Sequence, residues 1–280
     1  MNNSYSKGFQ LFRNQTNQLS IMQNFLKKNI NKKDSQRKIS NLSFLSVGGG
    51  DGYFDKLLLS FLKKTNININ YNILEPYDVF FPALSKNINP LMLEEKLNIS
   101  IIQQPFEKYI STQKFDFIIF AHSLYYIYDR LLAIKRAKEM LLPKGEMLVF
   151  IETEEGLIDL QTKFFSQLDN DLREIFSSSN LKNILKKKKI FYKEEKHDDY
   201  IDFSDYLFST NNQRELLLSF ILNTEFAELK ATLKREILDY LEKNILQKKG
   251  GKLLYHPLSI ITIPQIRRDK NERTIQQDSC

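Results

Sequence analysis

Residues 42–52 read LSFLSVGGGDG, and this stretch decides the fold of the chain. The apolar run before Gly48 predicts a short buried strand, and FDKLLLSFLKK at 54–64 has the spacing of a helix. The glycine-rich loop therefore joins a strand to a helix, which is where α/β sheets bind their ligands. Because glycine has no side chain, a ligand can lie directly against the backbone there.

Further apolar runs alternate with helical segments after this loop. Strands are predicted at 69–75, 97–103, 115–121 and 146–152, and a helix at 129–142. Strands that are apolar throughout and alternate with helices indicate a parallel sheet covered on both faces. The expected fold class is therefore α/β and Rossmann-like, with helices on both faces of the sheet.

The two ends of the chain have other patterns. Residues 5–29 have the spacing of one amphipathic helix, followed by a polar linker at 32–37. The segments 156–186 and 203–247 look mainly helical, with a strand-like stretch at 191–203 between them. The apolar run at 252–263 predicts an added edge strand, because Pro257 argues against a central one.

Composition narrows the class of protein. The chain has 280 residues, of which 42% are hydrophobic and 27% charged, as in an ordinary globular protein. No apolar run is long enough to span a bilayer, and the N-terminus lacks the pattern of a secretory signal. The one cysteine, Cys280, excludes a disulfide framework and a thiolate metal site. We therefore expect a cytoplasmic protein without a metal.

The net charge of +7 suggests nucleic acid as a partner, but the distribution of the charge argues against it. The densest basic run, residues 186–189, has no interleaved aromatic or glycine residues. Such a run is typical of a solvated helix end. Nucleic acid is thus not an expected partner.

The spacing of Gly48, Gly50 and Gly52 is G-x-G-x-G. It is not the dinucleotide fingerprint, because Tyr53 stands at the third glycine of that motif, and it is not a phosphate loop. It is the variant that methyltransferases use for a ligand without phosphates. Glu75 ends the next strand about 20 residues further on, where a carboxylate can bind both hydroxyls of a ribose. Loop and acid together indicate a nucleoside-containing cofactor.

Three stretches of the chain resemble the histamine N-methyltransferases and their relatives. They are residues 42–52 with NILEP at 72–76, FDFIIFAHSLYYIYD at 115–129, and GKLLYHPLSIITI at 251–263. The N-terminal segment is also similar, so the resemblance extends from Tyr5 to Ile263. It implies a seven-stranded methyltransferase sheet with a smaller helical substrate-binding part, and an S-adenosylmethionine-dependent enzyme that methylates a small molecule.

The resemblance also implies which residues bind the cofactor and the substrate. The cofactor positions are Gly48, Gly49, Gly50, Gly52, Glu75, Gln104, Ala121 and His122. The substrate positions are Tyr5, Phe9, Phe12, Gln18, His122, Tyr125, Tyr126, Phe220 and His256.

The polar substrate positions depart from the family, whereas the aromatic ones are kept. A glutamate that recognises the substrate in histamine-methylating members falls on Gln18, a glutamine on His122 and an asparagine on His256. We therefore expect the acceptor to be the amine nitrogen of a small molecule other than histamine.

Methyl transfer from a sulfonium is an in-line displacement, so the protein mainly has to bind, align and exclude water. A neutral amine needs no strong base, and an aromatic wall that includes Tyr126 favours it. A phenol or thiol needs a base, and histidine titrates near neutrality. His122 and Tyr126 are thus the expected catalytic residues. Whether His122 and His256 act as base, as anchor or only as buried structural residues stays open.

Two other functions fit the same pattern. One is a non-catalytic module that binds an adenosyl ligand, and the other is a methyltransferase that acts on RNA or protein. Against the latter, the fourth strand ends in AHSLYY and not in the Asn/Asp-Pro-Pro-aromatic signature. We expect a monomer with a small-molecule substrate and no membrane partner.

These patterns divide the chain into four expected parts. An N-terminal helical lid occupies 1–40, and the cofactor-binding core 41–152. The substrate-binding insertion and the closing strands occupy 153–263, and a disordered tail 264–280.

Overall fold

The computed structural model describes residues 3–37, 39–168, 174–206, 212–248 and 250–265. The strands within these ranges are β1 (Asn41–Val47), β2 (Asn68–Leu74), β3 (Leu97–Ile102), β4 (Phe115–Ala121), β5 (Leu141–Glu152), β6 (Lys193–His197), β7 (Tyr200–Asp202), β8 (Ile245–Lys248), β9 (Gly251–Tyr255) and β10 (Leu258–Pro264). The α-helices are α1 (Asn3–Asn14), α2 (Gln18–Arg37), α3 (Tyr53–Leu62), α4 (Phe81–Ile88), α5 (Arg130–Met140), α6 (Leu157–Phe164), α7 (Ser178–Lys187), α8 (Asn212–Leu222) and α9 (Ala231–Asn244).

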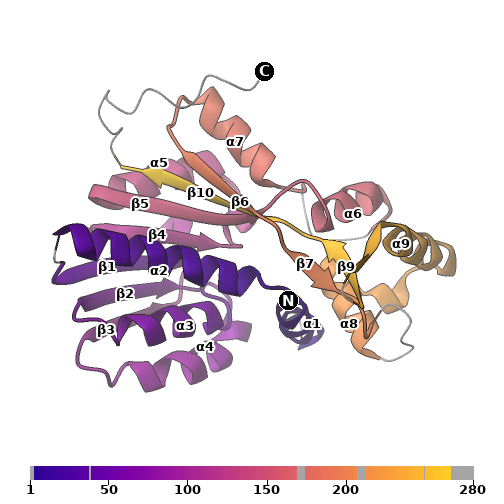
Figure 1. Ribbon diagram of the computed structural model, residues 1–280, viewed down its shortest axis with the longest axis horizontal. Coiled ribbons are helices and arrows are strands. Elements are labelled where there is room, and N and C mark those ends of the chain that lie inside the picture. The colour runs from indigo at the N-terminus through magenta and orange to yellow at the C-terminus, as the bar shows by residue number, and fades with distance from the viewer. Residues whose placement is uncertain (1–2, 38, 169–173, 207–211, 249, 266–280) are drawn as a thin grey trace.

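A seven-stranded sheet forms the centre of the molecule, as Figure 1 shows. Its order within the described residues is β3-β2-β1-β4-β5-β10-β6. The pairs from β3 to β5 are parallel, whereas β10 is antiparallel to both β5 and β6. The strand order reverses between β1 and β4, and such a switch point opens a crevice at the carboxyl ends of the strands. The α/β, Rossmann-like, seven-stranded fold is thus confirmed.

Helices cover both faces of the sheet because its central strands are apolar on both sides. On one face, α2, α3 and α4 pack against β1 and β2 through residues such as Leu26, Leu58 and Leu84. On the other face, α5 and α7 pack through Ile134 and Leu181. This burial on both faces explains why the strands read as continuous apolar runs.

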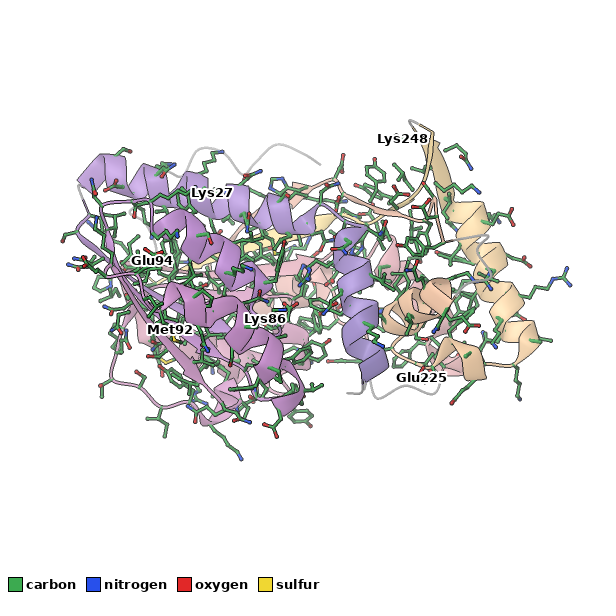
Figure 2. The ribbon with its side chains drawn as sticks, turned by 90° about the horizontal axis from the view of Figure 1, so that it is seen from below. Lys27, Lys86, Met92, Glu94, Glu225 and Lys248 are labelled. Atoms are coloured by element: carbon green, nitrogen blue, oxygen red, sulfur yellow. The ribbon has the colours of Figure 1, made fainter. Side chains whose placement is uncertain are left out.

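A smaller part with its own apolar cluster lies beside the sheet. It contains α6, α8 and α9 and a three-stranded sheet of order β7-β9-β8. In Figure 1, α1 lies between this part and the large sheet, and α1 packs against α8. Figure 2 shows the same arrangement from below, with Glu225 and Lys248 in the smaller part and Lys27 and Lys86 on the other side of α1.

Three expectations about the ends of the chain are wrong. The helix expected at 5–29 is two helices, because the carboxylate of Asp199 accepts hydrogen bonds from the backbone N–H of Asn17 at 3.1 and 3.2 Å and turns the chain there. The expected linker at 32–37 is the last part of α2. The run at 252–263 forms two strands, and β10 is an inner strand because Pro257 lies just before it and takes no part in its ladder.

The expected disordered tail lies mostly outside the described residues, which end at residue 265. The part that is described is ordered by contacts with the sheet. Pro264 ends β10, and the backbone N–H of Gln265 donates to the carbonyl of Gly145 at 3.0 Å.

Candidate functional site

The glycine loop leaves β1 at the carboxyl end of the sheet and leads into α3. Gly48, Gly50 and Gly52 have φ angles of +73°, +55° and +71°, which a residue with a side chain rarely adopts. A Cβ on Gly48 would lie 2.6 Å from Cβ of Ser123, and one on Gly52 2.5 Å from a methyl of Leu84. A Cβ on Gly50 would meet no atom within 4 Å. The loop is thus packed against neighbouring side chains at Gly48 and Gly52, whereas it faces open space at Gly50.

Glu75 follows β2 directly and supports this loop. One carboxylate oxygen accepts a hydrogen bond from the backbone N–H of Gly50 at 2.7 Å, and the other from that of Tyr77 at 2.9 Å. Burial raises the pKa of Glu75, while these two hydrogen bonds oppose the rise. Each carboxylate oxygen has a second lone pair, so the group can still accept bonds from a ligand.

A cavity of about 460 Å³ opens at this end of the sheet. The predicted residues that line it are Phe9, Phe12, Gln18, Gly48, Gly49, Gly50, Glu75, Gln104, Ala121, His122, Tyr125, Tyr126 and Phe220. The volume lies within the range of small-molecule sites. Its lining joins the open glycine loop and a strand-end carboxylate, so the residues present fit a nucleoside-containing cofactor such as S-adenosylmethionine.

Two of the predicted residues that the structure describes, Gly52 and His256, do not join this lining. Gly52 lies behind the loop against α4. His256 is fully buried, with its ring 5.6 Å from that of Phe12 between centroids. Tyr5 belongs to α1, but its side chain lies outside the described part of the structure.

Aromatic side chains form the wall of the cavity opposite the sheet. Phe220 of α8 lies 5.6 Å from Phe9 and 5.1 Å from Phe12 between ring centroids. Tyr125 and Tyr126 lie in the turn after β4, with their centroids 4.6 Å apart, and both line the cavity. The wall therefore combines α1, α8 and the turn after β4, three segments far apart in the sequence.

An ion pair that the sequence did not reveal connects α1 to the glycine loop. Nη1 of Arg13 lies 2.5 Å from a carboxylate oxygen of Asp51. The guanidinium also lies over the ring of Tyr53, 4.2 Å from its centroid. Because Arg13 pairs with Asp51 of the glycine motif, α1 lies beside the glycine loop. The same helix also contributes to the aromatic wall.

Asp55, also missed from the sequence, lies buried beneath the loop at the cavity wall. Its Oδ1 accepts a hydrogen bond from the hydroxyl of Tyr71 at 2.7 Å. Burial raises the pKa of Asp55 to about 6, although hydrogen bonds from Ser46 and Tyr71 oppose this effect. In the sequence, the only sign of this buried carboxyl group is an acid on the apolar face of a predicted helix.

His122 follows β4 and lines the cavity between the loop and the aromatic wall. Its Nδ1 lies 3.0 Å from Oε1 of Glu152, the last residue of β5. The sequence did not single out Glu152, because it read as the polar end of a strand. Since β4 and β5 are neighbours in the sheet, their ends bring the two side chains together.

Gln18 begins α2 and is buried at the cavity wall. Its side-chain amide donates to the backbone carbonyl of His256 at 3.3 Å. Neither nitrogen of the His256 ring has a hydrogen-bond partner among the described residues, and burial lowers the pKa of this ring to about 4. Gln18 and His256, both expected to contact the substrate, thus contact each other, and of the two only Gln18 lines the cavity.

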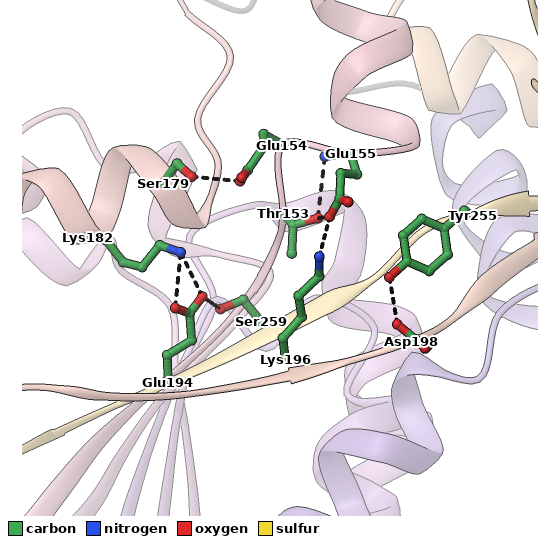
Figure 3. A network of polar contacts seen from close by, with 10 residues as sticks. All are labelled: Thr153, Glu154, Glu155, Ser179, Lys182, Glu194, Lys196, Asp198, Tyr255 and Ser259. Carbon is green, nitrogen blue, oxygen red and sulfur yellow. Dashed lines mark hydrogen bonds and ion pairs between the residues drawn. The ribbon is translucent and has the colours of Figure 1, made fainter. Parts of the chain in front are cut away.

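Surface polar contacts hold the segment after Glu152, as Figure 3 shows. Glu154 accepts a hydrogen bond from the hydroxyl of Ser179 at 2.7 Å, and Glu155 forms an ion pair with Lys196. Within the described ranges, no group of three possible ligand side chains is arranged to hold a metal ion. Nor is any helix of the described chain long and apolar enough to cross a membrane.

Comparisons with known proteins relate the chain to methyltransferases. The family model described as a methyltransferase domain matches residues 18–188. Histamine N-methyltransferase of Bos taurus is 29% identical over 241 residues, covering 80% of this chain and 82% of the relative. The enzyme of the same name from Cavia porcellus is 26% identical over 278 residues, covering 92% and 94%. A solved structure assigned as a methyltransferase from Bacillus halodurans C-125 has a TM-score of 0.56 at 11% identity, covering 81% of this chain and 94% of that one.

Proposed function

Because the chain belongs to the family of S-adenosylmethionine-dependent methyltransferases, we propose that its methyl acceptor is the nitrogen of a small amine. When bound, S-adenosylmethionine supplies the activated methyl group. The single observation that carries the proposal is the one cavity that joins the glycine loop and Glu75 to an aromatic wall, with His122 between them.

The cofactor end of the cavity consists of the glycine loop, Glu75, Gln104 and Ala121. Gly48 and Gly50 let an adenosyl ligand lie against the backbone, and Gly52 allows the loop to turn into α3. Glu75 offers its free lone pairs to the ribose hydroxyls.

The acceptor end consists of the aromatic wall, Gln18 and His122. Faces of aromatic rings attract cations, so Tyr125 and Tyr126 favour both a sulfonium and a methylated amine. Phe9, Phe12 and Phe220 exclude water from the acceptor, which helps to align it with the methyl group. The polar positions that differ from those of the family, Gln18, His122 and His256, favour an amine other than histamine.

A methyl-transfer assay with labelled S-adenosylmethionine tests the proposal. The acceptors are histamine, a set of primary and secondary arylalkyl and alkyl amines, and matched phenols and thiols. We expect turnover of at least one amine and poor turnover of histamine. Turnover confined to phenols or thiols contradicts the amine assignment. Bound cofactor without any turnover contradicts the enzymatic one.

A further inference from the structure

A buried carboxylate lies behind His122 and has no role in the function proposed so far. Glu152 is 7% exposed, and its Oε1 is 3.0 Å from Nδ1 of His122. Among the described residues Nδ1 has no partner with full hydrogen-bond geometry, so this short contact depends mostly on charge. Charge attraction needs no alignment and is strong where water is excluded.

The ring of His122 is fixed so that its other edge faces the cavity. Nδ1 is buried against Glu152, while the side chain as a whole is 22% exposed and lines the cavity. The exposed edge is therefore the one that carries Nε2. The backbone of His122 has a φ of 53°, which is unusual for a residue with a side chain, and its N–H donates to the carbonyl of Phe150 at 3.0 Å. Strained residues of this kind concentrate at functional sites.

Two ionisable side chains face His122, namely Glu152 from β5 and His256 from the loop between β9 and β10. Burial is the largest single influence on Glu152 and raises its pKa, but the charge of a protonated His122, a hydrogen bond to His122 and the charge of His256 together lower that pKa to about 2. Burial lowers the pKa of His256 to about 4. Near neutral pH the carboxylate is thus ionised and His256 is uncharged.

The remaining charged groups of the cavity do not offset this carboxylate. Arg13 is paired with Asp51 at the glycine loop, and Glu75 adds a further acid. When His122 is neutral, the cluster of His122, Glu152 and His256 therefore has one net negative charge. A buried carboxylate without a cationic partner is costly, so the cluster favours a cation beside it.

We propose that His122 accepts a proton from the substrate, that Glu152 positions and stabilises its protonated ring, and that the substrate is an amine which arrives as an ammonium ion. In this step an N–H bond of the ammonium breaks, its electron pair stays on the nitrogen, and the proton binds to Nε2 of His122. The resulting free amine is the nucleophile, and the proton passes to solvent after the product leaves. Glu152 is a positioning residue, since it does not line the cavity. The inference rests on the proposed function and adds the protonation state of its substrate.

The pH dependence of kcat/KM tests this role in Glu152→Gln and His122→Asn. The acceptor is the best amine of the panel, and the range is about pH 6 to about pH 10. Asparagine tolerates the left-handed backbone at His122 but cannot take up a proton. Glu154→Gln is the matched control, because Glu154 lies two residues further on and bonds to Ser179 on the surface.

At pH 7 we expect both variants to lose about 100-fold in kcat/KM, as for removal of a general base. The loss should shrink toward pH 10, where an alkyl amine loses its proton to solvent at about its own pKa. In a second readout, calorimetry with S-adenosylhomocysteine present, Glu152→Gln should weaken binding of 2-phenylethylamine but not of 2-phenylethanol. The control variant should behave as the wild type in both.

The outcomes separate this inference from the proposed function. A loss that is the same at every pH, or an unchanged rate at pH 7, overturns the role of the His122–Glu152 pair while leaving amine methylation intact. Wild-type protein that binds the cofactor but methylates no amine at any pH overturns the proposed function and this inference with it. Circular dichroism and cofactor affinity show whether each variant is folded.

Discussion

At the residue scale, Gly50 is the position where the loop meets open space. We expect Gly50→Val to weaken binding of S-adenosylhomocysteine by more than about tenfold, or 1.4 kcal/mol, because the side chain would occupy that space. Gly250→Val is a matched control, since Gly250 also has a positive φ and no atom within 4 Å of its Cβ but lies in the turn between β8 and β9. Calorimetry measures both affinities. Equal affinity in the two variants would mean that the space at Gly50 is not the cofactor site.

Glu75 combines a structural role with the expected cofactor role. We expect Glu75→Ala to weaken S-adenosylhomocysteine binding by about 2–4 kcal/mol, because it removes a charged acceptor for two hydroxyls. The same change also releases the N–H groups of Gly50 and Tyr77. Comparing adenosine with 2′,3′-dideoxyadenosine as competitors separates the two effects. If the variant still prefers adenosine as strongly as the wild type does, the ribose contact is refuted.

We expect Gln18 to limit the turnover of histamine, which is largely a monocation at pH 7. Without a carboxylate at this position an ammonium loses about 2–5 kcal/mol, or about two to four decades of kcat/KM. We expect poor histamine turnover, a gain in Gln18→Glu, and a larger gain when His256→Asn is added.

The acceptor assay measures these gains, and thermal unfolding accompanies it. Gln18→Glu removes the bond to the carbonyl of His256, so some stability is lost along with the gain. Efficient histamine turnover by the unmodified protein would contradict the prediction. The structure adds a reason to expect poor histamine turnover, since the buried carboxylate beside His122 is Glu152 at the end of β5, and no acid of α2 is among the described residues that line the cavity.

At the scale of elements, α1 and α2 have different roles although both precede the sheet. Phe12 and Arg13 of α1 reach the cavity, whereas Phe25 and Leu26 of α2 belong to the core of the sheet. We therefore propose that the N-terminal lid consists of α1 and the start of α2, where Gln18, Leu19 and Met22 also line the cavity.

Deletion of residues 1–14 tests the lid without damaging that core. We expect turnover to be abolished, because Phe9 and Phe12 leave the aromatic wall, and cofactor affinity to fall by no more than about tenfold. Gly8→Leu is a point variant with the same aim, since a Cβ there would lie 2.6 Å from the carbonyl oxygen of Leu216 and push α1 away from α8. Full activity in the folded deletion variant would show that α1 is not needed.

Local signals made most of the sheet predictable from the sequence. The apolar run of β1, the glycines after it and the acid after β2 are all neighbours in the chain. The break between α1 and α2 was not predictable, because it depends on Asp199, which lies 182 residues away. β10 is an inner strand because β6 pairs with it. The proposed role of Glu152 depends on its contact with His122, which follows a different strand, β4. Contacts between distant segments have no pattern in one sequence.

At the scale of the whole molecule, the site lies where the large sheet, α1 and the smaller part meet. The sheet supplies the glycine loop, Glu75 and the His122–Glu152 pair, while α8 supplies Phe220. The residues proposed for the cofactor thus come from the sheet, whereas those proposed for the acceptor come from both the sheet and the smaller part, which has a separate apolar cluster. Changes in the smaller part should therefore alter the choice of acceptor more than the affinity for the cofactor.

The buried cluster of His122, Glu152 and His256 makes the stability of the molecule depend on pH. Burial lowers the pKa of His256 from 6.5 to about 4. Below about pH 6.5 the unfolded chain takes up a proton that the folded chain accepts only near pH 4, so the free energy of unfolding falls as the pH falls through this window. The loss amounts to at most about 3 kcal/mol. Asp55 acts in the opposite direction, because burial raises its pKa from 3.8 to about 6.

A comparison of wild type with His256→Asn isolates the contribution of this histidine, because Asp55 is present in both. Asparagine keeps a polar side chain but has no proton to gain between pH 7 and pH 4.5. We expect the free energy of unfolding of the wild type to fall relative to the variant over that range, by about 1–3 kcal/mol. Urea denaturation at several pH values measures the difference. Parallel curves for the two proteins would mean that His256 is not held neutral beside Glu152, and the net charge assigned to the cluster at His122 would have to be revised.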